Sequence, residues 1–117
     1  LTILDYRTHK IAGHIPLRLA PLGANVALDC RRGLMPFGVT LTKDERTLYV
    51  ALLAFNAVAV VDVATRTVRG LIPTGWGASR VALSPDERTL YVTSARGYGA
   101  GPNGGRTFQK PPQGTYI

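Results

Sequence analysis

The heptapeptide DERTLYV occurs twice in this chain, at Asp44–Val50 and again at Asp86–Val92. The match extends outwards, because Val39–Val50 aligns with Val81–Val92 at an offset of 42 residues (81 − 39). A fixed period of this size indicates repeated structural units, each of which buries its core against its neighbours. The doubled heptapeptide therefore predicts a solenoid, a propeller or another repeat array.

The units are built from strands. Short runs rich in Val, Leu and Thr alternate with turns such as KDER and PDER, in which Asp binds nearby backbone amides, and no segment shows a sustained helical period. The first 17 residues align with Val58–Thr74 at an offset of 57 (58 − 1). The two offsets differ by 15 (57 − 42), so about fifteen extra residues lie within Arg18–Met35.

Four short antiparallel strands in each unit of about 40 residues are typical of a β-propeller blade. We therefore predict an all-β fold, a segment of a β-propeller built of four-stranded antiparallel blades. The expected parts are a half blade (1–17), a long loop (18–35), a complete blade (36–74), a half blade (78–95), a second long loop (96–114) and the start of a new strand (115–117). About two blades cannot close a propeller. Other blades of the same polypeptide, or partner chains, are expected to complete it.

The stretch SPDERTLYVTS at Ser84–Ser94 resembles the repeat core of YVTN-repeat (YncE-like) β-propellers. Glu45 and Glu87 stand where that repeat commonly has a turn glycine. GLIPTGW and GYGAGPNGG are similar to a bacterial subgroup in which the propeller precedes an alkaline-phosphatase-superfamily phosphoesterase domain. The resemblance implies an exported protein, periplasmic or at the cell surface. It covers the propeller part alone, and the subgroup's metal-binding phosphoesterase residues have no counterpart here.

Several kinds of site are not expected. No stretch approaches 18 apolar residues, so we expect no membrane span, and no signal peptide is recognisable. The single cysteine, Cys30, cannot form an internal disulfide and is expected to be a free buried thiol. His9 and His14 have no carboxylate or thiol at ligand spacing, so we expect exposed histidines and no metal.

Catalytic and cofactor motifs are not recognisable either. Ser79, Ser84 and Ser94 occupy repeat or strand positions without an identifiable histidine and aspartate partnership. The loop GYGAGPNGGR has the glycine spacing of a phosphate loop but lacks its Lys-Ser/Thr and the helix that must follow. We expect no cofactor and no catalytic residue in this chain. Whether the protein is an enzyme is left open.

The distribution of charge points to one face. In a four-stranded antiparallel blade both long loops emerge at the same edge, opposite the hairpin turns. Seven bases lie in or beside these loops against one acid, Asp29, giving +6 of the net charge of +7. The bases are Arg18, Arg31, Arg32, Arg80, Arg96, Arg106 and Lys110. Loops on a rigid scaffold commonly carry binding. The alternative is that these are scattered solvated arginines whose charge other blades or an acidic partner cancel.

We therefore predict a non-catalytic scaffold or interaction module, whose basic loop face binds an anionic ligand, a partner protein or an attached domain. The candidate ligand-binding residues are Trp76, Arg80, Arg96, Arg31, Arg32, Arg106 and Lys110. For Trp76 a cap over the core is favoured over stacking on a ligand, because tryptophan is highly buried on average. The first alternative is the propeller portion of a bacterial phosphoesterase. Nucleic-acid binding by the basic face ranks third, because no platform of interleaved aromatic and basic residues is recognisable.

Overall fold

The computed structural model describes residues 1–17 and 34–97. This part of the chain folds into eight strands and contains no helix. All strand pairs are antiparallel, and within each sheet the strands pair in the order of the sequence. The strands are β1 (Thr2–Asp5), β2 (Lys10–His14), β3 (Pro36–Leu41), β4 (Thr47–Leu52), β5 (Ala57–Asp62), β6 (Thr67–Pro73), β7 (Ala78–Leu83) and β8 (Leu90–Ser94).

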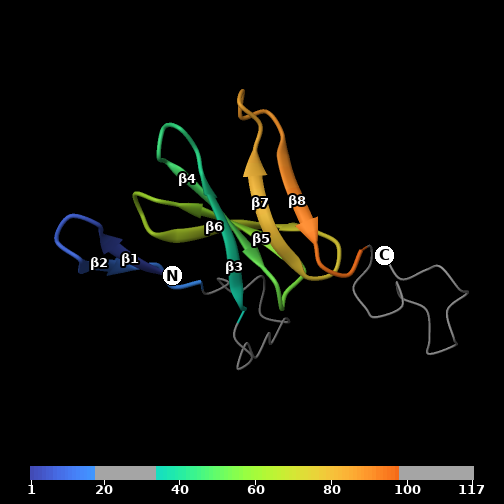
Figure 1. Ribbon diagram of the computed structural model, residues 1–117, viewed down its shortest axis with the longest axis horizontal. Coiled ribbons are helices and arrows are strands. Elements are labelled where there is room, and N and C mark those ends of the chain that lie inside the picture. The colour runs from blue at the N-terminus through green and yellow to red at the C-terminus, as the bar shows by residue number, and fades with distance from the viewer. Residues whose placement is uncertain (18–33, 98–117) are drawn as a thin grey trace, which may run out of the picture.

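The strands form three sheets, with two, four and two strands. In Figure 1 the first sheet (β1–β2) lies on one side of the central sheet (β3–β6), and the third sheet (β7–β8) lies on the other. The all-β prediction is confirmed for the described residues. Their fold is that of a propeller segment, with one four-stranded blade between two strand pairs.

The two middle strands of the central sheet, β4 and β5, are covered on both faces. On one face Val50, Leu52 and Val61 pack against Ile15 and its neighbours from the first sheet. On the other face Ala51 and Val58 pack against the third sheet. This arrangement explains why the β5 sequence AVAVVD does not alternate between apolar and polar residues, since both of its faces are buried.

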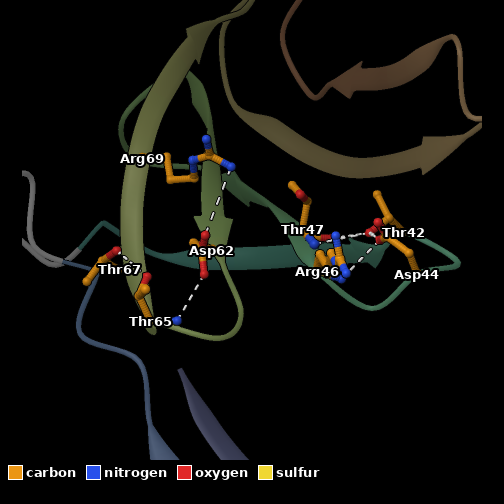
Figure 2. Close-up of polar contacts among 8 residues, drawn as sticks. All are labelled: Thr42, Asp44, Arg46, Thr47, Asp62, Thr65, Thr67 and Arg69. Carbon is orange, nitrogen blue, oxygen red and sulfur yellow. Dashed lines mark hydrogen bonds and ion pairs between the residues drawn. The ribbon is translucent and has the colours of Figure 1, made fainter.

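The repeated heptapeptide forms a turn followed by a strand. In the turn between β3 and β4, the Asp44 carboxylate accepts hydrogen bonds from the Thr42 hydroxyl (2.6 Å) and the Arg46 amide (3.0 Å), as Figure 2 shows. The Thr42 hydroxyl oxygen in turn accepts the Thr47 amide (3.0 Å). The turn between β7 and β8 repeats this network with its own serine, aspartate and threonine (Ser84, Asp86, Thr89). Asp44 and Thr42 therefore stabilise the turn.

The backbone explains a departure from the repeat pattern. Glu45 and Glu87 adopt φ of 58° and 57°, in the left-handed region that favours glycine. Both glutamates therefore hold a strained conformation. Glu87 has a compensating contact, because its carboxylate accepts the backbone amide of Lys43 in the neighbouring turn (2.6 Å).

Candidate functional site

The two edges of the central sheet differ in the residues that they carry. At one edge the hairpin turns meet, since the Val63 amide donates to the Arg46 carbonyl (3.0 Å). At the other edge the connections between hairpins meet, since the Thr74 amide donates to the Asn56 carbonyl (2.9 Å). We call the first the turn edge and the second the loop edge. The hairpin turns and the short connections of the central sheet thus lie at opposite edges. The two long loops that were predicted at the loop edge lie mostly outside the described residues.

The acidic residues within 1–17 and 34–97 all lie in the hairpin turns or at the ends of the strands that lead into them. They are Asp5, Asp44, Glu45, Asp62, Asp86 and Glu87. Basic residues lie nearby, and Figure 2 shows Arg69 of β6 reaching Asp62 across the β5–β6 hairpin (4.0 Å). The loop edge carries Arg96 with no acidic residue beside it among the described residues. Positive charge at this edge is therefore not balanced locally within the described ranges.

Trp76 is held at the loop edge by backbone hydrogen bonds. Its amide donates to the Gly97 carbonyl (2.9 Å), and its carbonyl accepts the Arg96 amide (3.1 Å). The neighbouring Gly77 carbonyl accepts the Ala95 amide (2.9 Å). These bonds continue the β7–β8 pairing beyond its last strand residues. They fix the backbone on both sides of the indole.

The Arg96 guanidinium lies over the Trp76 ring, with its central carbon 5.2 Å from the ring centroid. A cation–π contact at an exposed site contributes about 0.5–1 kcal/mol. Arg96 is exposed and Trp76 is half-buried, and Trp76 belongs to neither apolar cluster of the described residues. The indole therefore supports an arginine at the surface.

Asn56 is a residue of this edge that the sequence analysis missed. It occupies the left-handed region (φ 53°), which Asn tolerates better than most residues. Its side-chain oxygen accepts the Gly77 amide (2.8 Å), and its carbonyl accepts Thr74. Asn56 thus ties the loop between β4 and β5 to the loop that carries Trp76. An Asn at the end of a strand hairpin was the available signal.

Glycines allow the close approach at this edge. A side chain at Gly75 would collide with the Gly97 carbonyl and with the Ser94 hydroxyl oxygen at 2.9 Å. Gly77 has φ of 72°, where a side chain would be strained. The sequence GWG is therefore the local reason that Trp76 can lie next to Arg96.

The remaining predicted residues are placed as follows. Arg80 lies within β7 and is exposed, and its Cα pairs with that of Thr93. Arg31, Arg32, Arg106 and Lys110 lie outside the described residues, as do Cys30 and most of both long loops. The structure thus brings Trp76 and Arg96 together. It places Arg80 on the same sheet, away from the loop itself.

The histidines were expected to be exposed, and both are. His14 Nδ1 lies 3.4 Å from the Thr2 hydroxyl oxygen. No group of three or more His, Cys, Asp or Glu side chains within the described ranges is placed to hold a metal ion. In the same ranges, no helix is long and apolar enough to cross a membrane.

Comparison with known proteins supports a β-propeller. Over 61 residues, half of the chain (50%), it is 41% identical to the seven-bladed beta-propeller protein Rv1057 of Mycobacterium tuberculosis. The chain spans 16% of the length of that relative. No protein-family model matches the chain.

Among solved structures, the chain is similar to a chain of the Kuenenia stuttgartiensis hydrazine synthase. The TM-score is 0.61 and the sequence identity 28%, over 80% of this chain and 22% of the other. Both proteins are several times longer than the segment that matches. The similarity therefore supports the architecture of the blades.

Proposed function

We propose that this chain is part of a non-catalytic propeller scaffold whose loop edge binds an anionic ligand. The observation that carries the proposal is the Arg96 guanidinium stacked on Trp76, at an edge without a described acidic residue. Stacking restricts the guanidinium, which reduces the entropy lost when it binds an anion. The propeller likeness supports a scaffold or interaction module. Arg31, Arg32, Arg106 and Lys110 are proposed as further anion contacts.

The single tryptophan makes this proposal testable without a label. The chain contains one Trp, so fluorescence excited selectively at tryptophan reports on this site alone. We expect inorganic tripolyphosphate to quench Trp76 in a saturable manner. The Arg96→Glu variant should lose this response. The matched control is Arg88→Glu, an equal charge change in the β7–β8 turn, which should retain it.

Two results would count against the proposal. One is fluorescence that does not respond to tripolyphosphate in the unaltered protein. The other is an equal weakening by Arg96→Glu and Arg88→Glu, which would show that net charge matters and that the loop edge does not.

We propose a second candidate on the resemblance to YVTN propellers of the phosphoesterase-bearing subgroup. In that case the propeller would position substrate for a catalytic domain, and the protein would be periplasmic or at the cell surface. The complete open reading frame tests this directly. A frame without a metal-binding phosphoesterase domain would remove the candidate.

A further inference from the structure

The third sheet has one face turned away from the central sheet. On the inner face Val81 and Val92 pack against the central sheet. On the outer face Arg80, Tyr91 and Thr93 are exposed, and Tyr91 is 60% exposed. Strand alternation places these side chains together, because the Cα atoms of Arg80 and Thr93 pair across the two strands.

The sequence repeat gives this face an internal reference. Residues of β3 and β4 correspond to residues of β7 and β8 at the offset of 42, and both pairs have a register shift at the same place. The outer face of the third sheet therefore corresponds to the face of the central sheet on which the third sheet packs. If both faces served the same purpose, their residues would be alike.

The first difference is at the closest strand contact. Gly38 of β3 faces β7, and a Cβ on Gly38 would lie 2.6 Å from the Ser79 carbonyl oxygen and 2.9 Å from the Arg80 Cα. A side chain at this position therefore excludes a strand at that separation. The residue that corresponds to Gly38 on the third sheet is Arg80 (38 + 42). A strand cannot approach the outer face of β7 as β7 approaches β3.

The second difference is a pair of hydroxyls. Ala51, which is fully buried under the third sheet, corresponds to Thr93, which is exposed. The Thr93 hydroxyl oxygen lies 3.0 Å from that of Ser79, and the Ser79 hydroxyl also lies within hydrogen-bonding distance of the Thr93 carbonyl (3.2 Å). Polar groups thus occupy the place where the central sheet has a buried methyl group.

The third difference is in the turns. Glu87 binds the amide of Lys43, and the residue that corresponds to Lys43 is Pro85, which has no amide hydrogen. A following turn cannot form the same bond with Pro85. Three independent positions therefore depart from the contact that the third sheet makes with the central sheet.

We propose that the outer face of β7–β8 is a binding site for a small oxyanion, held by the Arg80 guanidinium and the hydroxyls of Ser79 and Thr93. A guanidinium offers paired donors that match carboxylate and phosphate oxygens, and the hydroxyls supply further donors. This inference goes beyond the proposed function, because it adds a second position that rests on observations of its own. Ser79 and Thr93 were not candidates in the sequence analysis.

The test uses the reaction of arginine with phenylglyoxal, followed residue by residue by mass spectrometry. In the protein without added anions, we expect Arg80 to react about as fast as exposed Arg88 in the β7–β8 turn. Inorganic phosphate or succinate should slow Arg80 by at least about fivefold, and Arg88 by less than about twofold. The two anions distinguish a phosphate site from a carboxylate site.

Two variants sharpen the test. Thr93→Ala places on this sheet the residue that the central sheet carries at Ala51, so it should fold, and it should weaken the protection of Arg80 at least about threefold. Ser79→Ala should act in the same direction. Loss of Trp76 quenching with intact protection of Arg80 would reject the loop-edge site and retain this one.

Three outcomes would overturn the inference. Arg80 that does not react in the absence of anions would show that another part of the polypeptide covers it. Equal slowing of Arg80 and Arg88 would show a general salt effect. Protection that is unchanged in both Thr93→Ala and Ser79→Ala would show that the hydroxyls take no part.

Discussion

At the scale of single residues, the turn aspartates show how a short motif stabilises the fold. Asp44 and Asp86 each accept a side-chain hydroxyl and a backbone amide, and the pKa of both carboxyls is lowered by these bonds. The hydroxyl donor is the larger cause in each case, Thr42 for Asp44 and Ser84 for Asp86. The ionised form of both carboxyls is therefore favoured by folding.

A pH dependence follows from this direction. A carboxyl whose pKa is lowered by folding stabilises the folded state above its unfolded pKa and loses that contribution as the pH falls through the folded pKa. We expect stability against urea to be level from pH 7 to about 5 and to fall below about pH 4. Thr42→Val should raise the pKa of Asp44 towards its ordinary value, measured by NMR titration of the carboxyl carbon. The pKa of Asp86 should not move, which provides the control.

The two left-handed glutamates make a matched pair. Glu45→Gly relieves the strain of φ 58° and should stabilise the protein by about 0.5–1 kcal/mol in urea unfolding. Glu87→Gly relieves the same strain but removes the acceptor of the Lys43 amide, so its gain should be smaller or reversed. Equal gains in the two variants would show that the contact between the turns contributes nothing.

At the scale of elements, contact between sheets depends on backbone approach as well as on apolar side chains. Gly38 lets β3 and β7 meet, and Ala51 and Val58 fill the space beside them. Tyr49 packs in the same cluster, whereas Tyr91, its counterpart in the repeat, is exposed. A tyrosine that recurs at the same repeat position is typical of packing between blades. Within the described residues Tyr49 packs in this way, and Tyr91 has no neighbour there to cover it.

Gly38→Ala measures this contact. The new methyl group would meet backbone atoms that cannot move aside, so we expect a loss of about 1–3 kcal/mol in the free energy of unfolding. Gly70→Ala is the control, because a Cβ at Gly70 meets nothing within 4 Å and should change stability by less than about 0.5 kcal/mol. A tolerated Gly38→Ala would mean that the sheets can separate without loss.

At the scale of the whole molecule, the apolar residues on β3 show that the described blades need neighbours. Phe37, Val39 and Leu41 are 64%, 55% and 44% exposed. Val81, the counterpart of Val39, is 9% exposed because the central sheet covers it. Valine at this repeat position is thus buried on β7, where the central sheet covers it, and exposed on β3, where no described strand covers it.

We therefore expect the 117-residue chain by itself to bind a hydrophobic dye such as ANS and to self-associate. Analytical ultracentrifugation and ANS fluorescence would test this. A monomer that binds no dye would contradict it.

The repeat allowed much of the fold to be predicted, because an offset of 42 residues fixes which strands correspond and the turn residues fix where strands end. It also showed that Trp76 occurs once, whereas Tyr49 and Tyr91 recur at the same repeat position. The Trp76–Arg96 contact was not predictable, since it depends on glycines and on Asn56, whose backbone conformation is not written in a strand pattern. Arg80 was a candidate, but the exposed face that it shares with Ser79 and Thr93 was not predicted, for a related reason. The comparison of this face with the central sheet depends on how closely β3 and β7 approach, which only the structure shows.

The contact between Glu87 and the Lys43 amide also bears on how such a protein can grow. One side of the contact is main chain, so a gene that duplicates this unit of 42 residues copies both halves of the contact at once. A newly duplicated blade can then form this hydrogen bond with the preceding blade at once, before any of its side chains has changed. A change to proline at the position of Lys43 removes the amide hydrogen, and the next blade can then no longer form this hydrogen bond.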